Sequence, residues 1–484
     1  MSEIELKFQI PAQKHKAFRL AFQRKKPEPV QLQAKYFDTA DCCLQQRKIA
    51  LRQRLENHTW MQTLKAPKNA IERIEIESEL GEQEPAVIDL AMYLQDAKLK
   101  KLLEPLLQPQ NPLQLQFETR VQRQRFIQKI ADSEIELAFD QGEIIASQRS
   151  APVNEIEFEL KQGDIRDLIQ AILPWIKKYH IWLDSGSKAL KGQMLQQSCS
   201  AAPVQYQSAL KLNAADDCDT ALKKIIANCL EHLLPNSSAI ASGQFSSEHV
   251  HQTRVAIRRL RSALKTFAFE SPAVSKAALW QQKLADLFRQ FGATRDRDAL
   301  SESFMPQLIA AGSPIVQLPL LQETEAVNIP DIFQTPATTL LLLELIEFAY
   351  SPPQKSPKLK KPLNKRLHKM HAHICRAQTQ FAHMQDAEKH QLRKRVKTLR
   401  YSVEFASSLY SKTKVKTYLK ALKPLQDNLG RFNDLSVAYS LFEKNTQQQP
   451  EAWFVLGWIT AEKQQLEKHI VKSLKHFSQA QPFW

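Results

Sequence analysis

The chain has 484 residues, of which 43% are hydrophobic and 24% charged, a globular composition that excludes wholesale disorder or a fibrous repeat. It holds only 10 glycines and neither G-x-G-x-x-G nor G-x-x-x-x-G-K-[ST], which excludes Rossmann and Walker loops and leaves side-chain cations to hold any phosphate. The net charge of +16 is uneven: residues 1–200 contain 29 basic and 27 acidic residues and the remainder contains 38 and 24, which predicts a polyanionic partner for the C-terminal part.

Charged and apolar residues alternate with a period of two along several segments of residues 1–200. Glu3, Glu5 and Lys7 alternate with apolar neighbours at the N-terminus, and residues 72–80 and 155–161 repeat the pattern. Successive side chains of a strand point to opposite faces, so each segment has one apolar and one charged face. The pattern predicts an antiparallel sheet or barrel.

The charged strand faces allow two interpretations. A single face of this kind is typical of the solvated side of an amphipathic sheet. Together, however, the strands carry rows of like charge that repel one another unless opposite charge lies between them. We therefore favour a closed barrel with a charged lumen and an apolar outside covered by helices. Its basic residues would be Arg52, Arg54, Lys65, Arg73, Arg123 and Lys188, and its acidic residues Glu3, Glu5, Asp140, Glu157 and Glu159.

A lumen of mixed charge predicts a particular ligand. Arginine and lysine bind phosphate oxygens by charge-assisted hydrogen bonds, whereas carboxylates can ligate Mg²⁺ or Mn²⁺, which then bridges to phosphate. We expect a metal ion together with a phosphate chain. No Ser–His or Cys–His pairing stands out in this half, so no covalent intermediate is expected.

Residues 196–209 are small and polar, carry one proline and are predicted to form a linker. From about residue 210, apolar residues recur at helical spacing, which predicts an all-α region over residues 210–484. A proline-rich break at residues 351–362 divides it into halves of about 210–350 and 363–480.

Three absences suggest where the protein resides. The sequence has no C-x-x-C, its N-terminus has no apolar leader, and its longest apolar run is far too short to cross a membrane. We expect a cytoplasmic protein without membrane association, and the oligomeric state stays open.

The helical region contains an internal repeat. Residues 251–261 match residues 390–400 at an offset of 139, and residues 291–296 match residues 429–434 at an offset of 138. The offset between the matching segments stays constant to within one residue, which indicates two homologous halves. Each half places one histidine and three cations on one helix stripe: His251, Arg254, Arg258 and Arg261 in the first, and His390, Arg393, Lys397 and Arg400 in the second.

Cations on one stripe repel each other, so a bound anion is a natural counterpart. The alternative is a solvated helix face with ordinary packed histidines, and the duplication of the stripe argues against it. The stripe lacks interleaved aromatic residues, which makes nucleic acid an unlikely partner. No histidine cluster has the ligand spacing of a zinc site.

The N-terminal motifs resemble the CYTH domain, the family of triphosphate tunnel metalloenzymes. The resemblance covers about residues 1–195 and begins with Glu3-Ile-Glu5-Leu-Lys7, which is similar to the E-x-E-x-K signature of that family. The motifs that follow in order are Tyr36-Phe37-Asp38-Thr39, Leu51-Arg52-Gln53-Arg54, Thr63-Leu64-Lys65, Arg73 with Glu75, Phe117 with Thr119 and Arg123, Phe139-Asp140-Gln141-Gly142-Glu143, Glu155 with Glu157 and Glu159, and Ser187-Lys188.

The resemblance implies an eight-stranded antiparallel tunnel in which basic residues grip a triphosphate. It also implies Mg²⁺ or Mn²⁺ held by the paired glutamates and Asp140, with Glu5 and Lys7 acting at the reacting phosphate or water. Two of Glu155, Glu157 and Glu159 would be ligands, and the last two are preferred. Because Arg120 and Arg125 flank Arg123, the choice among these three arginines depends on register.

The C-terminal motifs resemble the CHAD domain over about residues 210–484. The resemblance rests on the stripe around His251, on Arg295 with Asp296, on residues 399–401 and on Gly430 to Asp434. It implies duplicated helical bundles whose histidines and basic residues bind inorganic polyphosphate.

The order of the two regions is similar to that of bacterial inorganic triphosphatases. It implies a metal-dependent enzyme that hydrolyses tripolyphosphate to pyrophosphate and phosphate. One alternative is a hydrolase or cyclase acting on an organic triphosphate, such as thiamine triphosphate, a nucleotide or an RNA 5′ end, with Trp60 or Tyr36 stacking on the head group. The other is a non-catalytic polyphosphate-binding or targeting protein.

Overall fold

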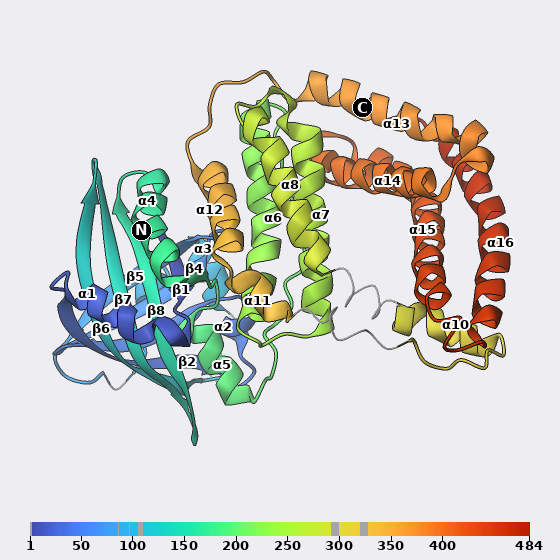
Figure 1. Ribbon diagram of the computed structural model, residues 1–484. Helices are drawn as coiled ribbons and strands as arrows, with labels where there is room; N and C mark the ends of the chain where they lie inside the picture. Colours follow the sequence, from blue (N-terminus) through green and yellow to red (C-terminus); the bar gives the residue numbers. More distant parts are fainter. Residues whose placement is uncertain (1, 86, 96, 105–109, 292–299, 320–327) are drawn as a thin grey trace. The chain divides into compact units, whose positions relative to one another are not determined.

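The fold is described from a computed structural model, shown as a ribbon in Figure 1. The structure describes residues 2–85, 87–95, 97–104, 110–291, 300–319 and 328–484. Its contacts divide the chain into two compact units. Unit 1 comprises Met1–Tyr206, Leu230–Gln252 and Ile329–Ser351, and unit 2 comprises Gln207–Cys229, Thr253–Asn328 and Pro352–Trp484.

Unit 1 is built around a closed antiparallel barrel of eight strands, which confirms the predicted fold. The strands are β1 (Ser2–Gln9), β2 (Glu28–Thr39), β3 (Ala50–Glu56), β4 (Thr59–Pro67), β5 (Glu72–Gly81), β6 (Leu113–Ile130), β7 (Ser133–Ala146) and β8 (Arg149–Gln162). Neighbours follow the order β5-β4-β3-β2-β6-β7-β8-β1, and β1 pairs again with β5 to close the sheet. A short strand, β9 (Trp182–Leu183), pairs with the end of β1.

Two helices, α1 (His15–Gln23) and α4 (Ile165–Tyr179), cover part of the apolar outer face of the barrel (Figure 1). Phe18 and Phe22 of α1 contact Phe139 of β7, with ring centroids 5.1 and 5.5 Å apart, and both contact Trp175 of α4. These rings remove a large apolar area from water. Since Phe139 faces outward, the neighbouring side chain of β7 must face the lumen.

One helix instead closes the interior of the barrel at one end. In α5 (Lys188–Gln197), Ala189 and Leu195 pack against inward-facing apolar residues of the strands. Gly192 lies so close to the Phe117 ring of β6 that an added Cβ would come within 2.2 Å of it, so only glycine fits without displacement. The helix begins at Lys188, after Ser187 accepts a hydrogen bond from the Leu190 amide as its N-cap.

The remaining helices of unit 1 come from several parts of the chain. α12 (Pro336–Tyr350) packs against α4, and the Ser185 amide donates to the hydroxyl of Ser238 in α6 (Cys218–Ala241). The shorter helical segments are 3₁₀ turns at Ala12–Lys14 and Ala91–Tyr93 and the helices α2 (Cys43–Gln46), α3 (Ala97–Leu103) and α11 (Ile329–Gln334).

The C-terminal part of the chain is mostly helical, as predicted. Its helices are α7 (Ser247–Phe267), α8 (Val274–Gln290), α10 (Met305–Ala310), α13 (Lys360–Gln380), α14 (Asp386–Ala406), α15 (Lys412–Glu443) and α16 (Ala452–Ser478). A π-helical turn spans Leu300–Phe304, and 3₁₀ turns span Ala268–Glu270, Phe381–His383 and Ser407–Leu409.

The helix bounds repeat with the sequence. α7 and α14 both contain 21 residues, and their first and last residues are each 139 apart (247 to 386 and 267 to 406). The starts of α8 and α15 are 138 apart (274 to 412). Arg295 and Asp296 lie outside the described residues. In the part of the chain that the structure describes, no helix is both long and apolar enough to cross a bilayer.

Candidate active site

The register of the barrel brings charged residues of four strands to one part of the lumen. On β1 and β8, Lys7 lies opposite Glu157 and Gln9 lies opposite Glu155. Asp140 of β7 lies opposite Glu155 on one side and Arg123 of β6 on the other. Directly opposite residues of antiparallel strands point to the same face, so these side chains meet inside the barrel.

Three carboxylates form the centre of the site. Asp140, Glu155 and Glu157, here called the carboxylate cluster, each offer an oxygen atom, and these atoms lie within 4.8 Å of one another. Asp140 and Glu155 are almost completely buried. Clustered carboxylate oxygens are hard ligands of the kind that Mg²⁺ and Mn²⁺ prefer, so the donor set fits a divalent ion.

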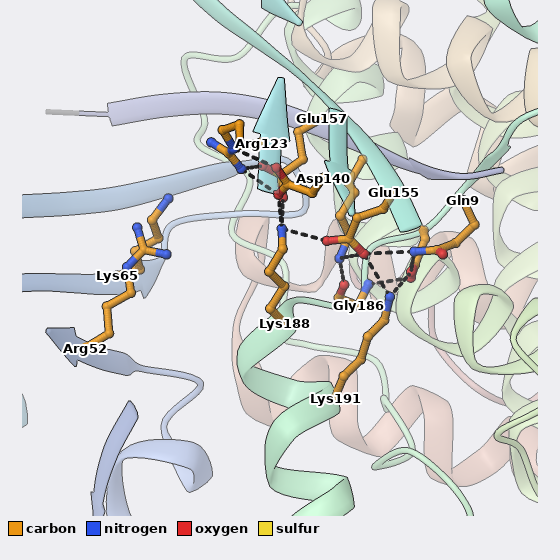
Figure 2. A network of polar contacts seen from close by, with 12 residues as sticks. Gln9, Arg52, Lys65, Arg123, Asp140, Glu155, Glu157, Gly186, Lys188 and Lys191 are labelled. Carbon is orange, nitrogen blue, oxygen red and sulfur yellow. Dashed lines mark hydrogen bonds and ion pairs between the residues drawn. The ribbon is translucent and has the colours of Figure 1, made fainter. Parts of the chain in front are cut away.

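Two cations balance most of the negative charge of the carboxylate cluster (Figure 2). The Lys188 ammonium lies 2.6 Å from Asp140 Oδ2, 2.8 Å from Glu155 Oε1 and 2.7 Å from Glu157 Oε1. Arg123 donates from Nε and Nη2 to the two Asp140 oxygens, both at 2.7 Å, and also to Glu157. Although burial by itself raises the pKa of Glu157, Lys188 and Arg123 hold that pKa below its usual value.

A second group of side chains contacts Oε2 of Glu155, the oxygen that Lys188 does not contact most closely. Gln9 Nε2 donates to Glu155 Oε2 and to Asp184 Oδ2, both at 2.9 Å. Lys191 of α5 lies 3.0 Å from the same Glu155 oxygen and 2.9 Å from Asp184. Lys7 lies 3.5 Å from Glu155 and donates to the Gly186 carbonyl. Glu155 is therefore anchored to β1, to α5 and to the segment between β9 and α5.

Three members of this second group, Gln9, Asp184 and Lys191, were missed in the sequence. Gln9 continues the alternation of Glu3, Glu5 and Lys7, which could have placed it on the lumen face. Asp184 and Lys191 follow the barrel strands, where no period of two exists. Their positions depend on how α5 packs, and the sequence carries no local signal for that.

The opposite side of the lumen holds another mixed cluster. Lys65 of β4 lies 2.8 Å from Glu75 and 3.3 Å from Glu3, and Arg52 of β3 lies 3.6 Å from Glu75. Burial, together with the hydrogen bond and charge of Glu75, raises the pKa of Glu3 to about 9. The two carboxylates therefore share a proton at neutral pH. Figure 2 shows Arg52 and Lys65 apart from the carboxylate cluster.

Glu5 lies under the influence of both clusters. Burial and the charge of Glu157 raise its pKa, and the cations Lys65, Arg73 and Lys188 oppose that rise. In the register, Glu5 faces Glu159, which pairs with Lys161 at 2.6 Å.

The structure therefore groups Glu155, rather than Glu159, with Asp140 and Glu157. Arg73 lies opposite Glu3 on β5. Arg54 pairs with Glu56 at 2.9 Å and with Glu77 at 3.2 Å.

Of the three arginines of β6 considered in the sequence, Arg123 is the one that contacts the carboxylate cluster. Arg120 lies three residues from Arg123 on the strand and therefore points to the opposite, outer face. Its side chain is 59% exposed and lies 3.8 Å from Glu118. Arg125 pairs with Glu28 and Glu56 and is 31% exposed.

In unit 2, α7 and α14 each contribute two cations to what we call the basic helix cluster. Burial and the charges of Arg393, Arg258 and Arg254 lower the pKa of the half-buried Lys397 to about 7, with Asp434 opposing them. Arg254 donates to the Phe291 carbonyl at 2.6 Å and stacks over Phe288. The basic helix cluster consists of Arg254, Arg258, Arg393 and Lys397.

The other predicted residues of the two stripes have different surroundings. Burial lowers the pKa of Arg261, with Arg289 adding to the effect. Arg400 pairs with Glu404 at 2.7 Å and donates to Gln426 at 3.0 Å. The His390 ring lies 2.6 Å from Asn433 Oδ1. His251 lies on α7 within unit 1.

Known proteins resemble the two parts of the chain separately. An inorganic triphosphatase from Haemophilus influenzae is 34% identical over 164 residues, which are 33% of this chain and 44% of that protein. The aligned part thus spans less than half of that curated relative. The solved CHAD domain from the plant Ricinus communis is 30% identical over 57% of this chain and 96% of its own, with a TM-score of 0.43. A candidate adenylate cyclase from Bacillus halodurans is 23% identical over 37% of this chain and 89% of its own, with a TM-score of 0.27.

Two family models match the chain in succession and agree with the motifs and with the observed architecture. The CYTH domain model matches the barrel and ends in the first turn of α5, and the CHAD domain model matches from within α6 to the end of α15. This chain therefore carries a CYTH domain at residues 1–190 followed by a CHAD domain at residues 224–443.

Proposed function

We propose that residues 1–195 hydrolyse tripolyphosphate to pyrophosphate and phosphate in a metal-dependent reaction. The observation that carries the proposal is a closed barrel whose lumen places three clustered carboxylates beside the cations Lys188 and Arg123, with Arg52 and Lys65 also in the lumen. The H. influenzae relative, which is called an inorganic triphosphatase, supports the same class of reaction.

The cations of the lumen would bind the substrate. Arg52, Arg54, Lys65, Arg73, Arg123 and Lys188 would bind the phosphate oxygens, since arginine and lysine form charge-assisted hydrogen bonds with them. The carboxylate cluster would hold Mg²⁺ or Mn²⁺, with Glu3, Glu5 and Glu159 as further candidates. Such an ion supplies Lewis-acid neutralisation of charge on the phosphate oxygens.

Glu5 is the candidate general base. Its carboxylate would accept a proton from the attacking water as the new P–O bond forms and the bridging P–O bond breaks. Burial and the charge of Glu157 raise its pKa, which makes the carboxylate a stronger base. Lys7 lies beside Glu155 and would orient the reacting phosphate.

The aromatic residues favour an inorganic chain over an organic triphosphate. Tyr36 stacks on Phe117 with ring centroids 4.5 Å apart, and it is 5% exposed. Trp60 is 6% exposed. Neither ring is open to stack on a thiamine or nucleotide head group, which removes the two candidates that the sequence offered for such a substrate.

The test is phosphate release from tripolyphosphate, ATP and thiamine triphosphate, with Mg²⁺, Mn²⁺ or EDTA. The wild type should release phosphate mainly from tripolyphosphate and only with metal, and Glu5→Ala should lose the activity. Glu118→Ala is the matched control, since Glu118 lies on the outer face of β6 beside Arg120. Activity mainly on an organic triphosphate would overturn the substrate, and no activity on any would favour a binding protein.

We further propose that residues 210–484 bind inorganic polyphosphate at the basic helix cluster. Four cations from two helices gather there, and burial together with their mutual repulsion lowers the pKa of Lys397. A polyanion would relieve that repulsion. Labelled polyphosphate should therefore bind, and RNA should compete weakly. Strong preference for RNA would contradict this proposal.

The pKa of Lys397 makes polyphosphate binding pH-dependent. Lys397 is protonated below pH 7 and largely neutral above it, and a bound polyanion would raise its pKa, so binding takes up a proton above pH 7. The affinity should stay level below pH 6 and fall by up to about tenfold per pH unit above pH 7. Binding of labelled polyphosphate between pH 6 and 9 measures the slope.

Lys397→Met should weaken polyphosphate binding at pH 6 and remove this slope. Lys414→Met removes an exposed lysine of α15 and should keep the slope of the wild type. An unchanged slope in Lys397→Met would contradict the prediction.

A further inference from the structure

The ammonium group of Lys188 lies between the three side chains that are best placed to hold a metal ion. Its distances to Asp140, Glu157 and Glu155 are 2.6, 2.7 and 2.8 Å, and these are the residues whose ligand atoms cluster within 4.8 Å (Figure 2). One positive charge on α5 therefore occupies the position that a divalent ion bound by the same three carboxylates would take.

The two cations exclude each other. Mg²⁺ requires oxygen ligands at about 2.0–2.1 Å, so an ion shared by the three carboxylates would lie in the space now filled by the ammonium nitrogen. Like charges at such short range also repel strongly in a partly buried site. Lys188 must leave the carboxylate cluster before the ion can take all three ligands.

The surroundings let Lys188 leave while the carboxylates stay in place. Glu155 remains anchored through Oε2 by Gln9 at 2.9 Å and by Lys191 at 3.0 Å. Asp140 remains held by the two hydrogen bonds from Arg123. Lys188 contacts the other oxygen, Glu155 Oε1, at 2.8 Å, and neither Gln9 nor Lys191 binds to that atom in the described structure. A cation that displaces Lys188 would therefore meet Oε1 while Oε2 stays anchored.

We propose that Lys188 is an internal substitute for the metal ion, which balances part of the negative charge of the carboxylate cluster and is displaced when the ion enters. The inference rests on the metal site of the proposed function. A triphosphate offers Lys188 new oxygens to bind, so substrate would draw the ammonium away and open the carboxylate cluster to metal. Metal and substrate then bind cooperatively, and metal binds weakly to the protein alone.

The test measures Mn²⁺ binding to the full-length protein by isothermal titration, in the absence of any phosphate. Lys188→Met should tighten Mn²⁺ binding about tenfold or more, because the competing charge is gone. Lys188→Arg keeps a positive charge and should bind Mn²⁺ no more tightly than the wild type. The same Lys188→Met protein should bind tripolyphosphate more weakly.

Lys191→Met is the matched control. Lys191 lies on the same helix and contacts Glu155, but it pairs with Asp184 and contacts neither Asp140 nor Glu157 in the described structure. Its loss should change the Mn²⁺ affinity by less than about fivefold. Equal tightening in Lys191→Met and Lys188→Met would show a general charge effect and overturn the proposal.

Folding is checked by melting curves with and without Mn²⁺. Without metal, Lys188→Met should melt at a lower temperature than the wild type. Mn²⁺ should raise the melting temperature of Lys188→Met by more than it raises that of the wild type. A Lys188→Met protein that stays unfolded at saturating Mn²⁺ contradicts the proposal. Wild-type hydrolysis of tripolyphosphate is assayed in parallel. If the wild type hydrolyses tripolyphosphate but Lys188→Met binds Mn²⁺ no more tightly than the wild type, only the substitute role is rejected. If the wild type neither binds Mn²⁺ nor hydrolyses tripolyphosphate, the proposed function is rejected as well.

Discussion

Glu155→Gln and Glu157→Gln should each lower metal-dependent hydrolysis of tripolyphosphate by at least about 100-fold, whereas Glu159→Gln should keep most of the activity. All three glutamates share one face of β8, but the carboxylate cluster contains Asp140, Glu155 and Glu157. Glu159 pairs instead with Lys161 and lies opposite Glu5. Steady-state rates against Mn²⁺ concentration measure the difference.

The dependence on Mn²⁺ separates loss of a ligand from loss of fold. Loss of a ligand should raise the Mn²⁺ concentration needed for half-maximal rate, whereas partial unfolding should lower the rate at every concentration. Circular dichroism checks that Glu155→Gln folds, because that variant leaves Lys7 and Lys191 near an uncharged amide. If Glu159→Gln loses as much activity as Glu157→Gln, the ligand set lies further along β8 than the structure indicates.

Arg123→Ala should destabilise unit 1 by about 3 kcal/mol and abolish hydrolysis. Asp140 has no exposed surface, and Arg123 donates two hydrogen bonds to it. Removal of one partner of a buried ion pair typically costs about 3–5 kcal/mol, because the remaining charge stays buried. The lower end applies here, since Lys188 still contacts Asp140. Urea denaturation followed by tryptophan fluorescence measures the loss.

Arg120→Ala provides the comparison on the same strand. Arg120 is 59% exposed and its distance to Glu118 is 3.8 Å, so its loss should change stability by less than about 0.5 kcal/mol. Arg123→Lys should recover part of the stability but little activity, because lysine cannot reproduce the two-pronged contact. Equal stability of Arg123→Ala and Arg120→Ala would mean that Lys188 alone compensates Asp140.

Much of the lumen could be predicted because a strand has a simple period. The alternation of Glu3, Glu5 and Lys7 fixes which face they share, and the barrel confirms that fold. The same period cannot tell Glu155 from Glu159, since both lie on the same face as Glu157. Their position along the lumen depends on the pairing of β7 with β8, which sets Asp140 opposite Glu155 and Glu136 opposite Glu159. The period of two does not encode this register.

The contribution of α5 could be predicted only in part. Lys188 follows from the family resemblance, but its place between three carboxylates depends on a helix packed into the end of the barrel. That packing requires Gly192 to lie against Phe117, two residues far apart in sequence. In the helical region, Arg254 and Arg258 of one stripe lie near Lys397 of the other. A helix face, however, cannot show that the long side chain of Arg400 pairs with Glu404 and Gln426.

The composition of unit 1 limits how the two proposed activities can be separated in the laboratory. Besides the barrel, unit 1 contains residues 230–252 and 329–351, which lie beyond the predicted linker. Truncation after residue 200 would remove α12 from the surface of α4 and uncover apolar side chains there. A recombinant fragment of this length would expose an aggregation-prone surface. Point substitutions in the intact chain are therefore the sounder way to silence one half and study the other.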